Sequence, residues 1–159
     1  FPNIECFTAM VSPYKHDENS LDEILSRSRF TISEDTYALV SIDVDSCDYY
    51  IFDTVERYRP KIAVVERASN SNLSDNFATY DNGCSFAALA KLGVQKGYTL
   101  VCDTLNCIFV RNDLIHLLPD EDFSMENLFQ DGNGVLRLQQ LNALNGQSVL
   151  LTLKMCTGI

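Results

Sequence analysis

The sequence is short of basic residues and has no long apolar run. Its 159 residues include 12 Lys and Arg against 22 Asp and Glu, which gives a net charge of -10. Nucleic acids and anionic membranes are bound by basic surfaces, so this charge argues against either as the principal partner. No apolar stretch approaches the roughly 20 residues that span a bilayer. The first residues, FPNIECFTAMVSP, also lack the basic and apolar regions of a signal peptide.

The start of the chain is itself informative. The first residue is Phe1 and not an initiator Met. We therefore expect a chain that is processed, truncated or part of a longer protein.

Motifs of cysteine and histidine are also missing. The chain has six cysteines but no CxxC pair, and neither of its two histidines stands at metal-ligand spacing to a cysteine, which argues against a zinc site. Most of the cysteines lie in apolar contexts, so we interpret them as small buried residues and not as a disulfide framework. This pattern predicts an intracellular, reducing compartment such as the cytoplasm or an organelle matrix.

What the sequence does contain is an alternation of strand and helix patterns. Apolar periodicity and turn residues predict strands at residues 4–11, 38–44, 62–65 and 149–155, and helices at 21–28, 47–58, 85–96 and 136–144. Ser20 and Glu23 form a capping box at the first helix. Residues 98–102 and 107–111 are predicted to form a hairpin. Alternation of this kind implies a mainly parallel sheet that is covered on both faces.

Acidic residues follow two of the predicted strands. Asp43, Asp45 and Asp48 come at the end of the run LVSI, and Glu66 ends the run IAVV. Neighbouring parallel strands present their carboxyl ends at the same edge of a sheet, which is where open α/β sheets bind ligands. We therefore expect Asp43, Asp45 and Glu66 to converge.

Several roles are open to this acidic cluster. Clustered carboxylates bind divalent metals, and a single carboxylate can act as a general base. The structural alternative is that Asp48 caps the following helix or adds charge to its first turn, with Asp45 in the turn itself. The loop at residues 68–82 is long enough to be functional, and it could supply Asn72 or Tyr80 to a pocket.

Five segments, taken in order, resemble a known family. They are LDEIL (21–25), SIDVDSCDYYIF (41–52), RPKIAVVE (59–66), GCSFAALAKLGVQKGYTLV (83–101) and CIFVRNDL (107–114). As a set they resemble the C-terminal half of FkbM-like S-adenosylmethionine-dependent methyltransferases, in which blocks of the form IDIDGNDYW and NAFFVR occur. The resemblance covers about residues 4–114.

The resemblance implies a fold and a domain organisation. The fold class is α/β, a Rossmann-like methyltransferase-type sheet that is mainly parallel, ends in a C-terminal antiparallel hairpin and lacks the first two strands. Residues 1–114 are then a partial methyltransferase-like domain, and residues 115–159 are a C-terminal extension that packs on it. Residues 4–11 correspond to the third strand of the family, and must pair with residues 38–44, pair with another chain or remain disordered.

The resemblance also implies an activity and a set of site residues. The activity is S-adenosylmethionine-dependent methyl transfer to an unidentified acceptor, with Asp43 and Glu66 as catalytic residues, Asp45 and Asp48 as cofactor-binding residues, and no metal. Ser46 stands where the family usually has glycine, which would allow a positive φ angle and close approach of a ligand.

A second departure concerns the cofactor. The only G-x-G is Gly132-x-Gly134, which follows no predicted strand. We therefore expect this chain alone to be inactive, with its sheet completed by an N-terminal half or by a protein partner. The alternative is a non-catalytic structural or assembly subunit derived from a methyltransferase.

Overall fold

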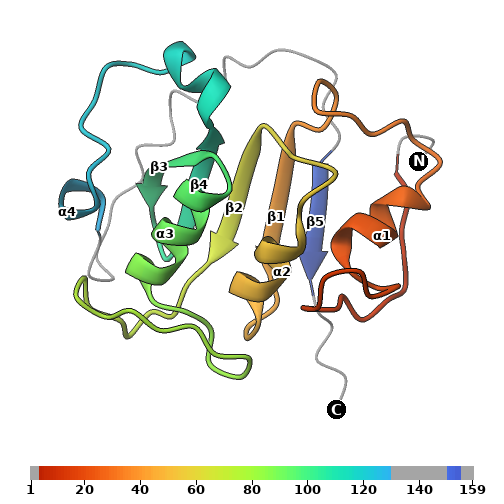
Figure 1. Ribbon diagram of the computed structural model, residues 1–159, viewed down its shortest axis with the longest axis horizontal. Coiled ribbons are helices and arrows are strands. Elements are labelled where there is room, and N and C mark those ends of the chain that lie inside the picture. Colours follow the sequence, from red (N-terminus) through yellow and green to blue (C-terminus); the bar gives the residue numbers. More distant parts are fainter. Residues whose placement is uncertain (1–3, 130–149, 155–159) are drawn as a thin grey trace.

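The computed structural model describes residues 4–129 and 150–154, which form an α/β fold (Figure 1). Its elements in chain order are α1 (Leu21–Ser26), β1 (Leu39–Asp43), α2 (Asp48–Thr54), β2 (Ile62–Glu66), α3 (Phe86–Gln95), β3 (Tyr98–Asp103), β4 (Asn106–Arg111), the 3-10 helix η1 (Asn112–Leu117), α4 (Met125–Leu128) and β5 (Leu150–Lys154). The helix predicted at residues 136–144 lies outside the described residues.

The sheet has the strand order β3-β4-β2-β1-β5 and is mixed. β1 runs parallel to β2, with Leu39 opposite Ile62, and also parallel to β5. β4 runs antiparallel to both β2 and β3. The α/β class, the parallel central pair and the C-terminal hairpin are confirmed. The sheet is less parallel than predicted, because the hairpin inserts β4 between β2 and β3 and reverses the strand direction there.

The strand predicted at residues 4–11 is wrong. This segment carries no regular secondary structure in the described chain, and it does not pair with β1 as one of the expected arrangements required. The outer edge of β1 is taken by β5, which confirms the strand predicted at residues 149–155. Residues 4–11 are held instead by polar contacts, in which Arg29 donates a hydrogen bond to the carbonyl of Ile4, and Glu5 accepts from Ser28 and from the backbone of Arg29.

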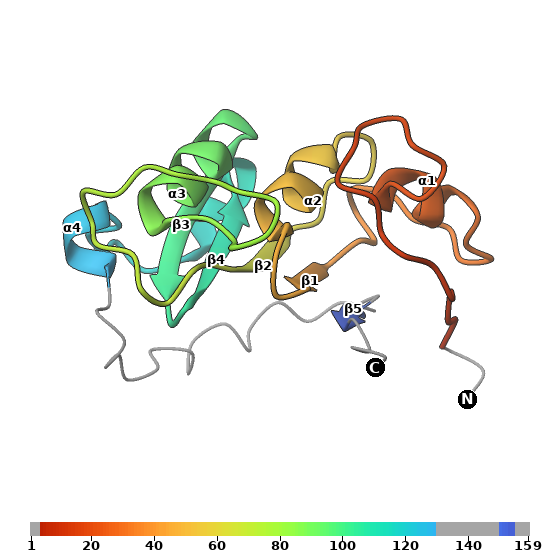
Figure 2. The same cartoon turned by 90° about the horizontal axis from the view of Figure 1, so that it is seen from below.

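The three α-helices α1, α2 and α3 lie on one side of the sheet. Figure 2 shows α1, α2 and α3 above the strands, where they cover the main hydrophobic core. The close fit of α3 depends on Gly93, because a Cβ atom at this position would lie 2.3 Å from the ring of Phe109 in β4. A second, smaller cluster of Ile62, Ile108 and Val110 lies on strands of the same sheet outside this core, and residues of η1 pack against it. Among the described residues, α-helices therefore cover one face of the strands rather than both.

The helix ends agree with the sequence prediction at α3 and differ from it at α1 and α2. Ser85 caps α3 as predicted and accepts a hydrogen bond from the backbone of Ala88. The capping box at α1 is not formed, since Ser20 makes no side-chain cap bond. α2 ends at Thr54, earlier than predicted.

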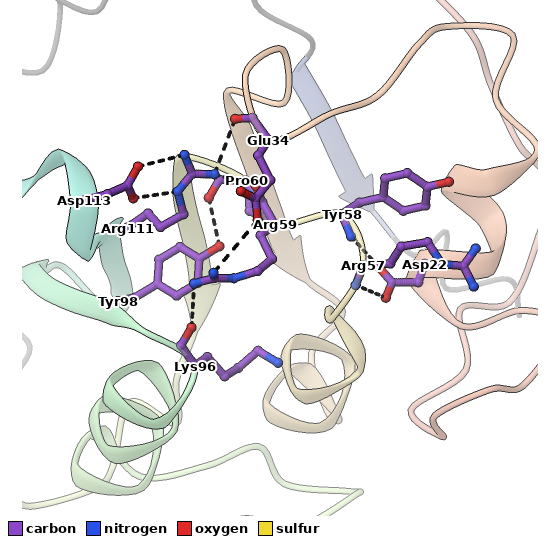
Figure 3. Close-up of polar contacts among 10 residues, drawn as sticks. All are labelled: Asp22, Glu34, Arg57, Tyr58, Arg59, Pro60, Lys96, Tyr98, Arg111 and Asp113. Carbon is purple, nitrogen blue, oxygen red and sulfur yellow. Dashed lines mark hydrogen bonds and ion pairs between the residues drawn. The ribbon is translucent and has the colours of Figure 1, made fainter.

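The segment that follows α2 is hydrogen-bonded to Asp22 of α1. The Asp22 carboxylate accepts hydrogen bonds from the backbone N–H groups of Glu56, Arg57 and Tyr58, at 2.9, 2.7 and 3.3 Å. Figure 3 shows Asp22 beside this turn, at the end of the sheet where β2 begins. The segment after α2 is thus bound in a turn instead of continuing as a helix.

The same end of the sheet carries a second polar network. Arg111 forms a two-point ion pair with Asp113 and donates to the backbone carbonyls of Glu34 and Arg59 (Figure 3). The hydroxyl of Tyr98 donates to the carbonyl of Pro60. These contacts fix the start of β2, so that its other end can present Glu66 in a defined place.

The sequence predicted neither a membrane-spanning segment nor a disulfide framework. The described helices include none that is both long and apolar enough to cross a membrane. Five cysteines in the described residues are free thiols, with Cys84 and Cys107 buried and Cys6 exposed. The sixth, Cys156, lies outside them.

Candidate functional site

The predicted convergence of acids at the carboxyl ends of β1 and β2 is confirmed. Asp43 ends β1 and Glu66 ends β2, and the parallel register places these ends side by side. One carboxylate oxygen from each of Asp43, Asp45 and Glu66 lies within 4.8 Å of the other two. Asp43 and Glu66 are half-buried and Asp45 is exposed.

Asp48 differs from the other three acids because its oxygens are already occupied. It is the first residue of α2 and is 2% exposed. Its Oδ1 accepts from the N–H of Val44 at 2.8 Å, and its Oδ2 accepts from the N–H of Ser46 at 3.1 Å. Asp48 therefore holds the turn that carries Asp45. It also places a carboxylate in the first turn of α2, as the structural alternative expected, but it does not cap this helix, whose N-cap residue is Cys47.

The left-handed residue of this turn is Asp45, one position before Ser46, where the resemblance places a glycine. Asp45 has a φ of 60°, and Ser46 is not among the described non-glycine residues with a positive φ. Aspartate tolerates this conformation better than most residues because its short polar side chain bonds locally. The turn thus forms without a glycine at position 46.

Burial and like charge raise the pKa values of two of these acids. The pKa of Glu66 is raised to about 6, first by burial and then by the negative charges of Asp43, Asp48 and Asp45. Burial also raises the pKa of Asp48, although its backbone hydrogen bonds act in the opposite direction. At neutral pH Glu66 is mostly ionised but titrates close to the physiological range, as a general base should.

A cleft of about 510 Å³ adjoins these acids. It lies at the carboxyl end of the parallel pair and is bounded by the turn after β1, the segment after β2 and the loop before α3. Its lining comprises Asp45, Ser46, Asp48, Glu66, Arg67, Ala68, Ser69, Asn70, Phe77, Asp81, Asn82, Gly83 and Leu105. This volume is in the range of small-molecule sites.

The long loop does contribute to this cleft, but through other residues than those predicted. Asn70, Asp81 and Asn82 line it, whereas Asn72 and Tyr80 do not. The ring of Tyr80 stacks on Tyr50 of α2, with centroids 4.0 Å apart. This stack ties the loop to α2.

A buried ion pair that no sequence pattern indicated lies at the wall of the cleft. Nε and Nη2 of Arg67 contact the two carboxylate oxygens of Asp103 at 2.8 and 2.7 Å, and both side chains are nearly inaccessible. The two residues are 36 positions apart in the chain, so no local motif reveals them. They meet because β4 brings the hairpin turn beside the end of β2, where the N–H of Arg67 donates to the carbonyl of Leu105.

The arrangement favours some ligands over others. The oxygens of Asp43, Asp45 and Glu66 are close enough together to hold a divalent cation. Glu66 could instead accept a proton from a bound hydroxyl group. The described residues offer no glycine-rich turn after a strand for a nucleotide cofactor, and the oxygens of Asp48 are engaged by the backbone. They therefore do not by themselves fit S-adenosylmethionine.

Comparisons of this chain with protein-family models, with curated proteins and with solved structures found no match.

Proposed function

We propose that this chain forms the acceptor side of an S-adenosylmethionine-dependent methyltransferase of the FkbM-like kind. The observation that carries the proposal is the meeting of Asp43, Asp45 and Glu66 at the carboxyl ends of two parallel strands beside a cleft. The antiparallel hairpin on the far side of β2 is also what the resemblance implies.

The proposal assigns only the acceptor side to these residues. Asp43 and Glu66 are the proposed catalytic pair: Glu66 accepts the proton that an acceptor hydroxyl loses, and Asp43 orients that hydroxyl. Asp45 is the proposed contact to the cofactor edge. Asp48, proposed with it from the resemblance, acts through the turn that it holds. A glycine-rich turn must come from other parts of the protein or from a partner.

The test separates cofactor binding from methyl transfer. S-adenosylmethionine is titrated by calorimetry into this 159-residue chain and into any longer native form of it, and methyl transfer is assayed in whichever form binds. We expect Asp43→Asn and Glu66→Gln to abolish transfer while cofactor affinity changes little. Transfer that survives both substitutions would refute the roles of Asp43 and Glu66.

A second function, a non-catalytic structural or assembly subunit, is favoured by one observation. The oxygens of Asp48 are engaged in holding the turn, and no glycine-rich turn follows a described strand. This alternative predicts that no native form of the protein binds the cofactor. Calorimetric binding to any native form would decide against it.

A further inference from the structure

The cleft beside Glu66 carries a charge pattern that restricts what can enter it. Four acids line it, Asp45, Asp48, Glu66 and Asp81, and Arg67 is the only basic residue in the lining. A ligand in this hollow therefore meets negative charge from the turn after β1, from the end of β2 and from the loop before α3.

Arg67 is not available to balance a negative ligand. Its side chain is 1% exposed, and its Nε and Nη2 are engaged by Asp103. Its Nη1 donates to the carbonyl of Ala68 at 3.1 Å. The positive charge is thus matched by a buried carboxylate, and a phosphate or carboxylate in the cleft would face acids without a free cation.

Three of the acids that line the cleft, in contrast to Arg67, have no partner in the part of the chain that the structure describes. Within the described residues, the side chains of Asp45, Glu66 and Asp81 take part in no ion pair or hydrogen bond. The oxygens of Asp45 and Glu66 lie within 4.8 Å of one another, so their negative charges repel each other and a cation placed beside both would relieve that repulsion.

The rest of the lining suits the uncharged part of a polar molecule. Asn70, Asn82 and Ser69 offer directional hydrogen-bonding groups, and the partly exposed ring of Phe77 offers an apolar surface. This mixture fits a compact carbon skeleton that carries hydroxyl groups.

We propose that the cleft binds a methyl acceptor that carries a protonated amine as well as a hydroxyl group, and excludes acceptors that carry a phosphate or carboxylate. That the ligand is a methyl acceptor rests on the proposed function. The charge preference rests on the cleft alone.

Three ring compounds of similar size test the charge preference. They are 4-aminocyclohexanol, 1,4-cyclohexanediol and 4-hydroxycyclohexanecarboxylate, which carry a positive charge, no charge and a negative charge at neutral pH. Each is titrated into the full chain at low ionic strength and followed by chemical-shift changes in nitrogen-labelled protein. We expect the amine to bind about tenfold more tightly than the diol, a difference that one favourable charge contact supplies. The carboxylate should not bind measurably.

Variants then locate the preference in the cleft. Glu66→Gln and Asp45→Asn should each remove most of the difference between amine and diol, and asparagine keeps the left-handed conformation that position 45 needs. Glu18→Gln is the matched control, because it removes one exposed acid outside the cleft. Circular dichroism confirms that each variant is folded.

Three results would overturn the inference. They are equal affinities for the three compounds, tighter binding of the carboxylate, or the same loss of preference in Glu18→Gln as in Glu66→Gln, which would reflect the net charge of the protein only. The readout is binding, so a failed methyl-transfer assay leaves a charge preference standing. Equal affinities would remove the acceptor class but leave methyl transfer untouched.

Discussion

At the residue scale, Glu66 has an ionisation that the fold disfavours. Its pKa is raised to about 6 by burial and by the neighbouring acids. A carboxyl whose pKa is higher in the folded than in the unfolded state adds stability below its unfolded pKa, and this contribution is lost as the pH rises through the folded pKa. The ionised form of Glu66 therefore opposes the folded state above about pH 6, and this penalty is absent below its unfolded pKa of 4.5.

Replacing this carboxyl should thus stabilise the protein in one pH range only. We expect Glu66→Gln to raise the melting temperature at neutral pH and to change it little below the unfolded pKa of glutamate, as measured by thermal unfolding across the pH range. Glu18→Gln, which alters an exposed acid outside the cleft, should show no such pH dependence. An equal effect of Glu66→Gln at both ends of the range would mean that packing and not charge sets the result.

Asp22 is a second residue whose role depends on a single carboxylate. It accepts hydrogen bonds from three consecutive backbone N–H groups after α2. Hydrogen bonds to a charged acceptor are worth more than neutral ones, so we expect Asp22→Ala to lower the free energy of unfolding by about 3 kcal/mol and Asp22→Asn by about half of that.

The neighbouring acid provides the control for Asp22. Glu23 pairs with Arg57 at 2.8 Å, but both side chains are substantially exposed. Surface pairs contribute little, so Glu23→Gln should cost less than about 1 kcal/mol in urea denaturation. If the two substitutions cost the same, the turn does not depend on Asp22.

At the scale of the element, α3 packs closely against the sheet because Gly93 has no side chain. A Cβ atom at Gly93 would lie 2.3 and 2.6 Å from two atoms of the Phe109 ring, which is fully buried and stacked on Phe52. A ring in this position has little room to move aside.

Gly93→Ala should therefore destabilise the protein although alanine is the better helix former. The gain of about 1 kcal/mol in helix propensity is set against overpacking of about 1–3 kcal/mol or more, and we expect a net loss of about 2 kcal/mol in urea denaturation. Val94→Ala, at an exposed position in the same helix, should be nearly neutral. A smaller ring neighbour, in Gly93→Ala combined with Phe109→Leu, should recover part of the loss. A stabilised Gly93→Ala protein would show that α3 can shift away from β4.

The helices and strands also show which features of the fold can be predicted from sequence patterns. The boundaries of α3 follow from Ser85 and Gly97, because the cap and the left-handed glycine act within one turn of the helix. Residues 4–11 have the composition of a strand, but composition does not say which edge of the sheet is free. The pairing of β1 with β5, distant in sequence, decides that.

At the scale of the whole molecule, the candidate site could be predicted only in part. The convergence of Asp43 and Glu66 follows from a general rule about parallel strands, so the strand order sufficed. The buried pair of Arg67 and Asp103 depends on the exact register of three strands, which no periodicity contains. The turn at Asp45 likewise depends on the hydrogen bonds of Asp48 and not on a glycine in the sequence.

The excess of acid is a property of the whole chain and predicts a salt response. With a net charge of -10, the folded protein repels itself, and its exposed ion pairs, such as Lys15 with Glu56, add little stability to be lost. Raising the salt from about 0.01 M to about 0.15 M shortens the screening length from about 30 Å to about 8 Å. We expect this change to stabilise the protein at neutral pH by about 1 kcal/mol, or about 3 °C in melting temperature.

The salt response should disappear at the pH where the net charge of the protein is zero. The isoelectric point is near 4.5, so near that pH salt has little overall repulsion to screen, and the melting temperature should be nearly constant from low to physiological ionic strength. Potassium chloride and sodium chloride should act alike, because the effect is screening and not binding of one ion. A melting temperature that falls with salt at neutral pH would contradict the prediction, since it would mean that attractive pairs such as Arg111 with Asp113 outweigh the excess of acid.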